Sequence, residues 1–160
     1  AVEKGVRQAL EDGVVAGFPV HDIRVIVHDG KSHPVDSKDI AFFQAGRKAT
    51  IEAIKAAGPI ILEPVVNIDV QAPDAYVGDL SGDLSSNRCQ VTGTQSRGAG
   101  SISINGRVPL AELDDYQGRL KSLTGGQGSY TIDFSHYAAV PAATQQLLAS
   151  QHKAEGAEEE

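Results

Sequence analysis

Strand-like and helix-like stretches alternate regularly between residues 64 and 140, and this order limits the folds open to the chain. Residues 66–71 alternate apolar and polar side chains one by one, which is typical of a strand with one buried face. Pro73 and Asp74 then open a helix that we expect to end near Ser86. The region therefore begins with a strand and a helix.

The same alternation continues to the end of the region. It predicts two strands, at residues 89–95 and 101–108, joined by a turn at residues 96–100. A helix at residues 109–120, a second turn at residues 124–126 and a last strand at residues 129–137 follow. The resulting order, βαββαβ, is that of the split βαβ or ferredoxin-like arrangement. Residues 64–140 are therefore expected to form a small α+β domain.

The first 63 residues predict a less regular order of helix, strand, loop and helix. The first helix ends at Gly13, and the β-branched side chains of residues 22–28 favour a strand. Asp29 and Gly30 mark a sharp turn after that strand. A polar, exposed loop is expected to follow the turn.

A long second helix follows this loop and runs to about residue 57. Asp36 or Ser37 can cap its N-terminus, because a short side-chain oxygen accepts a backbone N–H that has no partner in the helix. Gly58 and Pro59 end it. The residues expected on its inner face are Ile40, Phe43, Gly46, Thr50, Ile51 and Ile54.

The C-terminal residues predict a helix at 141–152 and a disordered acidic tail at 153–160. The formal net charge of −7 divides into −1 for residues 1–63, −3 for residues 64–140 and −3 for the remainder. Because phosphate contacts dominate non-specific affinity for nucleic acids, this charge argues against strong RNA binding by the chain alone. The single cysteine, Cys89, excludes an internal disulfide, and no apolar run approaches the roughly 20 residues of a membrane span. A cytoplasmic protein without a membrane partner is expected.

Residues that could carry catalysis are few. His28 and His33 have no cysteine or carboxylate cluster at zinc-ligand spacing, so no metal site is expected. Cys89 has no positioned histidine in the sequence, which favours a buried structural thiol. Asp79 and Asp83 share one helix face, and two such carboxylates usually face solvent. The sequence therefore predicts no catalytic residue.

One loop has the side chains for recognition. Asp29, Gly30, Lys31, Ser32 and His33, which we call the tip loop, place a cation, a hydroxyl and an imidazole between a strand and a long helix. These groups can hydrogen-bond RNA phosphates, 2′-hydroxyls or base edges. The same residues also fit an ordinary surface loop, and their spacing does not separate the two interpretations.

Several short motifs occur along the chain in a fixed order, at residues 1–6, 17–20, 29–30, 33–37, 62–64, 78–84, 108–112, 128–130 and 136–137. In order and spacing they resemble motifs of domains IV and V of the elongation factor G family. The resemblance covers roughly residues 1–150. It implies an incomplete unit similar to domain 2 of ribosomal protein S5, a ferredoxin-like domain, and a final helix that packs back on the first unit.

The family resemblance also implies a function and partners. Members are five-domain GTPases that move tRNA and mRNA through the ribosome, so the implied partners are the small-subunit decoding region, large-subunit RNA, the stalk base and tRNA–mRNA. The tip-loop histidine, here His33, is expected near the codon–anticodon duplex, and Arg88 and Arg97 are candidates for large-subunit RNA contact. Residues 78–83 lack the Gly-Lys-Ser/Thr ending of a phosphate loop. We therefore expect no cofactor in this chain, and GTP and Mg²⁺ in a GTPase domain outside it.

The chain departs from the family pattern at several positions. Pro34 replaces a usual acidic residue, and Gln127 a frequent arginine. Asn87-Arg88-Cys89 occupies the place where the family commonly has two arginines and a glycine, and Asp114-Asp115 replaces a Phe-Gly pair. Because positive charge is lost, a divergent paralogue is a further hypothesis, with ribosome recycling or protein interaction as alternatives to translocation. The chain is expected to begin inside domain IV, which leaves a sheet edge through which copies could associate.

Overall fold

The computed structural model describes the backbone of residues 1–158 and the side chains as far as His152. The chain forms two compact units, one of residues 62–139 and one of residues 1–61 together with 140–160. The disordered tail was expected at residues 153–160. The side chains of these residues, and the whole of residues 159–160, lie outside the described part. Each unit is described by itself.

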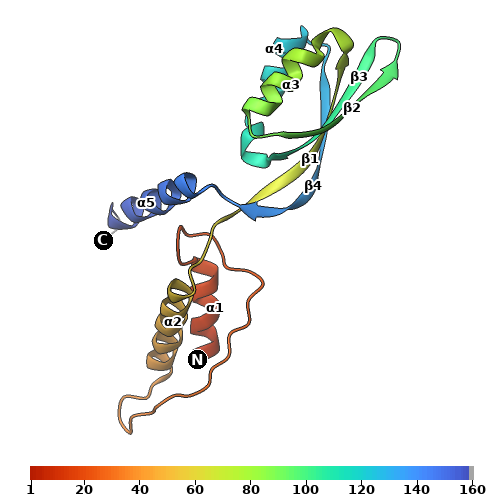
Figure 1. Cartoon of the computed structure of the whole chain (residues 1–160). Coiled ribbons are helices and arrows are strands. Elements are labelled where there is room, and N and C mark those ends of the chain that lie inside the picture. The colour runs from red at the N-terminus through yellow and green to blue at the C-terminus, as the bar shows by residue number, and fades with distance from the viewer. Residues whose placement is uncertain (159–160) are drawn as a thin grey trace. The chain divides into compact units, whose positions relative to one another are not determined.

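Residues 62–139 form a four-stranded antiparallel sheet with two helices (Figure 1). The strands are β1 (Leu62–Pro73), β2 (Gln90–Gly98), β3 (Ser101–Pro109) and β4 (Ser129–Ala139), in the order β2-β3-β1-β4. The helices are α3 (Val77–Ser86) and α4 (Tyr116–Thr124), with short 3₁₀ turns η1 (Asp74–Tyr76) and η2 (Leu110–Leu113). The predicted βαββαβ order and the α+β class are confirmed.

The core of this unit lies between the sheet and its two helices. The register pairs Val70 with Ile104 and Val66 with Val108, so the alternating apolar residues of β1 and β3 share one face. The buried residues that form this core are Val66, Ile68, Val70, Ala72, Leu80, Leu84, Cys89, Ile102, Ile104, Val108, Tyr116 and Leu120. Each buried large apolar side chain contributes about 1.5–3 kcal/mol, which makes this face the main stabilising element of the unit.

The helix expected from Pro109 is interrupted. Residues 110–113 form η2, and α4 begins only at Tyr116, because Asp115 takes a left-handed conformation with φ of 57°. Arg119 donates to the carbonyl oxygens of Glu112 and Asp114, both at 3.1 Å, and so satisfies acceptors at the break. The interruption redirects the chain so that Tyr116 is buried against the sheet.

The other unit is built on α1 (Val2–Asp12) and α2 (Asp39–Ala56), with α5 (Ala142–Glu158) attached. The first two helices cross at glycines: a Cβ on Gly5 would lie 2.0 Å from the carbonyl oxygen of Phe43, and one on Gly46 would lie 2.7 Å from that of Val2. The start of α5 is joined to this unit by two hydrogen bonds, from the Val140 N–H to the Ile61 carbonyl and from the Gln145 side chain to the Pro59 carbonyl.

The strand expected at residues 22–28 is absent. These residues are extended and exposed, and no described residue pairs with them. A strand is assigned only where a partner strand lies beside it. The turn expected at Asp29 and Gly30 lies instead at residues 34–36, where Pro34 fixes one backbone angle. The predictions of a strand and of the turn position were therefore wrong.

The start and inner face of α2 also differ from expectation. Lys38 is its N-cap and no side chain caps it, since the Ser37 hydroxyl instead accepts the His33 N–H. Gly46 and Thr50 are buried as expected, but Ile40 is 63% exposed. At the other end of the chain, α5 continues past the expected residue 152 to Glu158.

Candidate functional site

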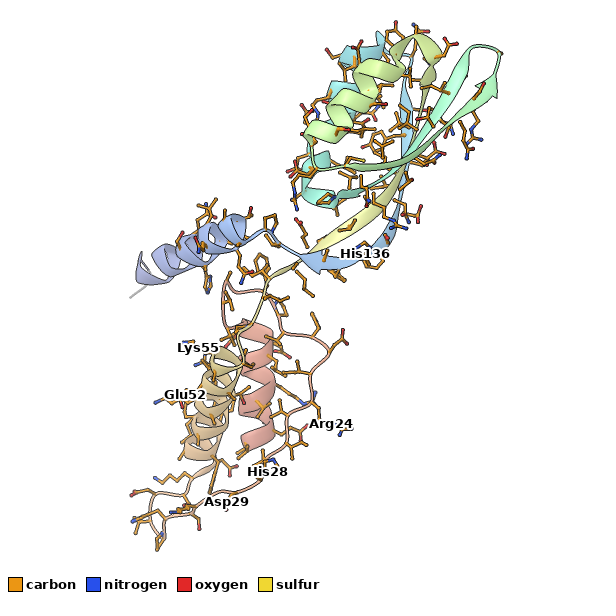
Figure 2. All side chains as sticks on the ribbon, in the orientation of Figure 1. Arg24, His28, Asp29, Glu52, Lys55 and His136 are labelled. Carbon is orange, nitrogen blue, oxygen red and sulfur yellow. The ribbon has the colours of Figure 1, made fainter. Side chains whose placement is uncertain are left out.

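The tip loop lies at the end of the extended segment, immediately before the turn that leads to α2. Figure 2 shows Asp29 there, with Arg24 and His28 along the segment that precedes it. The Asp29 carboxylate accepts the Gly30 N–H at 2.7 Å, and the Ser37 hydroxyl accepts the His33 N–H. All five tip-loop residues are exposed. The loop is thus closed by short-range hydrogen bonds, and its residues remain exposed to solvent.

The His33 ring has two alternative contacts at its Nδ1 atom. Val35 N–H donates to Nδ1 at 3.3 Å, which requires the ring proton to sit on Nε2. The Asp36 carboxylate lies 3.4 Å from the same Nδ1 and can accept only from a protonated one. In the first arrangement Nε2 carries the ring proton, and in the second a doubly protonated ring also carries a proton on Nε2. In both cases an Nε2–H donor remains on a side chain that is 66% exposed. The local geometry therefore presents a hydrogen-bond donor to solvent at the position expected for the tip histidine.

Arg88 lies between two carboxylates of its own unit. It forms an ion pair with Glu63 on β1 and a second one, at 3.3 Å, with Glu112 on η2. The hydrogen bond to Glu63 is the main reason why the pKa of Arg88 is raised above its usual value. Because this trio carries a net charge of −1, an RNA phosphate would have to compete with two glutamates for the guanidinium.

Arg97 is held in a similar way near the end of β2. Its guanidinium lies 3.3 Å from an oxygen of Asp69 and 3.3 Å from the Ser103 hydroxyl. Ser103 is fully buried and also donates to Asp69. Arg97 is still half exposed, so part of the guanidinium faces solvent. The structure brings Arg97 and Arg88 to separate carboxylate partners and assembles no basic patch from them.

The other candidate groups have structural roles. Burial raises the pKa of the Cys89 thiol, which makes it a poor nucleophile. Asp83 does not face solvent as expected: its carboxylate lies 3.5 Å from Arg119 and is mostly buried between α3 and α4, while Asp79 is exposed. Among the side chains that the structure describes, no three His, Cys, Asp or Glu groups converge as metal ligands.

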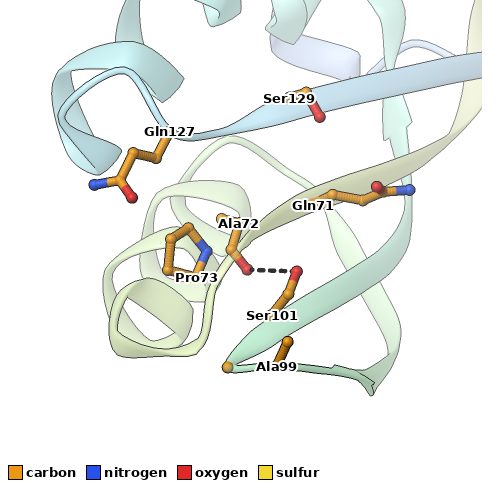
Figure 3. Close-up of a pocket in the computed structure, with 8 residues that line it drawn as sticks. Gln71, Ala72, Pro73, Ala99, Ser101, Gln127 and Ser129 are labelled. Atoms are coloured by element: carbon orange, nitrogen blue, oxygen red, sulfur yellow. Dashed lines mark hydrogen bonds between the residues drawn. The ribbon is translucent and has the colours of Figure 1, made fainter.

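A hollow of about 480 Å³ lies at one end of the sheet, where β1, β3 and β4 meet (Figure 3). It is lined by small and neutral residues: Gln71, Ala72, Pro73, Ala99, Gly100, Ser101, Gln127 and Ser129. No titratable side chain lines it, so the lining offers no general acid or base beside the hydroxyls of Ser101 and Ser129.

Sequence reasoning missed the partners of the candidate residues. Ser37 and Asp36 were considered only as helix caps, whereas they contact His33. Glu63 and Asp69, the two carboxylates of strand β1, were not considered as partners of arginines. A carboxylate in a strand with one buried face is the signal that could have indicated a half-buried ion pair.

Two family models match the chain in sequence order: "Elongation factor G, domain IV" over residues 1–58 and "Elongation factor G C-terminus" over residues 60–148. An elongation factor G of Aquifex pyrophilus is 46% identical over 141 residues, covering 88% of this chain and 20% of that protein. An elongation factor G-like protein of Thermotoga maritima is 40% identical over 160 residues, covering all of this chain and 23% of that protein.

A solved structure agrees with this assignment. A crystal structure of a Thermus thermophilus protein superposes with a TM-score of 0.79 at 39% identity, covering 95% of this chain and 23% of that one. The chain therefore belongs to the elongation factor G family, and the parts of the family that it matches are domain IV and the C-terminus. It spans less than a quarter of the length of these relatives. None of the described helices is both long and apolar enough to cross a bilayer.

Proposed function

We propose that this chain is the ribosome-contacting C-terminal part of a translational GTPase and promotes movement of tRNA and mRNA in the cytoplasm. The observation that carries the proposal is the match of two consecutive family models to residues 1–148, with an exposed tip loop inside the first. In this proposal domain IV contacts the decoding region of the small subunit, and the C-terminal domain contacts large-subunit RNA and the stalk base. GTP and Mg²⁺ belong to a GTPase domain of the longer protein.

The action proposed for the tip loop is mechanical rather than chemical. His33 can donate from Nε2 to a phosphate, a 2′-hydroxyl or a base edge, and Lys31 adds a positive charge beside it. Ser32 can donate or accept. These contacts would hold tRNA–mRNA in its advanced position by occupying the space behind it. No bond is made or broken by this chain in the proposed role.

A second candidate is a divergent paralogue with weak large-subunit contact, acting in recycling or regulation or as a protein-interaction module. It is favoured by the carboxylate partners of Arg88 and Arg97 and by the net charge of −3 over residues 64–140. Fewer phosphate contacts give a shallower fall of affinity with salt. A salt titration of ribosome binding, compared with the housekeeping elongation factor G, tests this candidate, and equal slopes would sink it.

The main experiment is single-turnover translocation by the full-length parent protein on pre-translocation ribosomes, with and without His33→Ala. We expect slower tRNA movement and unchanged GTP turnover, because the tip loop has no part in hydrolysis. His28→Ala is the matched control, since it removes another exposed imidazole, just outside the tip loop.

The outcomes separate the candidates. Equal translocation by the wild-type protein and His33→Ala would remove the tip loop from the mechanism. Ribosome-stimulated GTP turnover without translocation by either protein would favour recycling or regulation. A protein-interaction module would show neither ribosome stimulation nor any effect of His33→Ala.

A further inference from the structure

The two contacts of the His33 ring exclude each other, and the proton on Nδ1 decides between them. A ring whose only proton lies on Nε2 accepts the Val35 N–H at 3.3 Å. A doubly protonated ring cannot accept at Nδ1 and donates instead to the Asp36 carboxylate, one oxygen of which lies 3.4 Å away. Each protonation state therefore has its own partner, and both partners belong to the turn at residues 34–36.

The backbone of this turn is held without the Asp36 carboxylate. The Ser37 hydroxyl accepts the His33 N–H, and the Asp36 carbonyl oxygen accepts the Lys38 N–H at 2.9 Å. The Asp36 side chain is 82% exposed, so packing does not hinder its rotation. The distance of 3.4 Å can therefore shorten to the roughly 2.7–2.9 Å of a charged N–H···O bond while the turn keeps its shape.

Asp36 is the group of this region that favours a proton on the ring. Among the described side chains, it is the one carboxylate that forms an ion pair with His33. The other titratable groups of the tip loop and of the residues beside it are exposed, and they are His28, Asp29, Lys31, Lys38 and Asp39. The two lysines and the two aspartates among them have opposite charges that cancel in sum, and water and salt screen them.

We propose that Asp36 is a positioning residue for His33, and that it holds the ring doubly protonated while Nε2–H donates to an RNA phosphate. The phosphate on Nε2 and the carboxylate on Nδ1 place an anion at each end of the ring, and nearby opposite charges favour the charged form of an imidazole. The ring takes up one proton from solution at Nδ1 and releases the Val35 N–H to water. This inference rests on the function proposed for the tip loop and adds the class of RNA group that His33 contacts.

Proton uptake distinguishes a phosphate from the other RNA groups. A 2′-hydroxyl or a base edge carries no charge, so it would leave the ring neutral and bonded to Val35. A contact that takes up a proton weakens as the pH rises through the range in which imidazole titrates, between about pH 5 and pH 8. The proposed contact should therefore be strongest on the acidic side of neutrality.

The test is single-turnover translocation by the full-length parent protein at about pH 6 and about pH 8. Each rate is divided by the rate of His33→Ala at the same pH, which removes the pH dependence of the ribosome itself. This ratio should fall with rising pH for the wild-type protein. Asp36→Asn should lower it about 1.5- to 5-fold at about pH 6, as expected for an exposed ion pair, and should have little effect at about pH 8.

Asp39→Asn is the matched control, because it removes another exposed carboxylate close by, in the first turn of α2. A general charge effect would make both variants bind RNA more tightly, since each removes a negative charge. The proposal instead requires Asp36→Asn to be slower and Asp39→Asn to be as fast as the wild type or faster. Asp36→Glu should recover much of the lost ratio, because it restores the carboxylate.

The outcomes separate this inference from the function on which it rests. Asp36→Asn that is as fast as the wild type, or slowed equally at both pH values, would overturn the positioning role and leave the tip loop in the mechanism. A wild-type ratio that does not change with pH would equally overturn the phosphate contact. Equal rates of the wild type and His33→Ala at both pH values would instead contradict the proposed function, and this inference with it.

Discussion

The close crossing of α1 and α2 makes a sharp prediction for Gly5→Ala. An added Cβ would lie 2.0 Å from the Phe43 carbonyl oxygen and 3.0 Å from the Arg47 nitrogen, both backbone atoms. Because normal carbon–oxygen contacts exceed about 3 Å, the two helices must separate by about 1 Å, and no side-chain rotation can relieve the contact. Overpacking of this kind costs about 1–3 kcal/mol, while alanine in place of glycine inside a helix returns up to about 1 kcal/mol.

We therefore expect Gly5→Ala to destabilise its unit by about 1–2 kcal/mol, which lowers the melting temperature by roughly 5–15 °C for a domain of this size. Gly82→Ala is the matched control, because Gly82 lies inside α3 and a Cβ there meets no atom within 4 Å. The same substitution at that position should stabilise the other unit by about 0.5–1 kcal/mol.

The two units can be followed separately in one sample. All four tyrosines, Tyr76, Tyr116, Tyr130 and Tyr137, lie in residues 62–139, so tyrosine fluorescence reports only that unit. Circular dichroism in the far ultraviolet reports the helices of both. Gly5→Ala should lower the temperature of a helical unfolding transition seen by circular dichroism and leave the temperature of the tyrosine transition unchanged. A Gly5→Ala chain as stable as the wild type would show that α1 and α2 do not cross at this glycine.

Three further results are expected. A hydrogen bond from the Gln8 amide, and next one from the Arg47 guanidinium, lower the pKa of Asp12. The Asp12 carboxylate therefore stabilises the fold above about pH 4, and this stabilisation is lost as the pH falls through the lowered pKa. In urea unfolding, Asp12→Asn should reduce the stability by about 0.5 kcal/mol near neutral pH and should have no effect once the pH is below the lowered pKa. Arg88→Ala should lower the free energy of unfolding by about 1–2 kcal/mol, because Glu63 and Glu112 lose their shared cation. Arg88→Gly should lower it by less, because Arg88 has a left-handed φ of 60°, which glycine adopts without strain. Equal losses of stability in the two variants would argue against backbone strain at this position. Burial of Cys89, which raises the pKa of its thiol, should limit its reaction with a disulfide reagent to the rate of unfolding, and rapid labelling in native buffer would contradict this.

The sequence alone determined the architecture of residues 62–139 and the family. Alternation in β1, apolar residues at helical spacing and glycines at turns all indicate the same elements there, so local and global preferences agree. The motifs of the chain likewise identified the elongation factor G family, which the family models confirm. The roles of His33 and the rest of the tip loop stay a prediction, because recognition depends on a partner that lies outside the chain.

The tertiary structure was needed wherever a segment with a local structural preference has no partner, or a side chain meets a partner far away in the sequence. Residues 22–28 have strand-forming side chains, yet a strand exists only when another pairs with it, and none of the described residues does. Arg88 was a candidate RNA contact by position, but it pairs with Glu63, 25 residues away in sequence and adjacent only after β1 takes its place. Hydrogen bonds and ion pairs between distant residues depend on the completed fold, and for that reason periodicity and spacing could not reveal them.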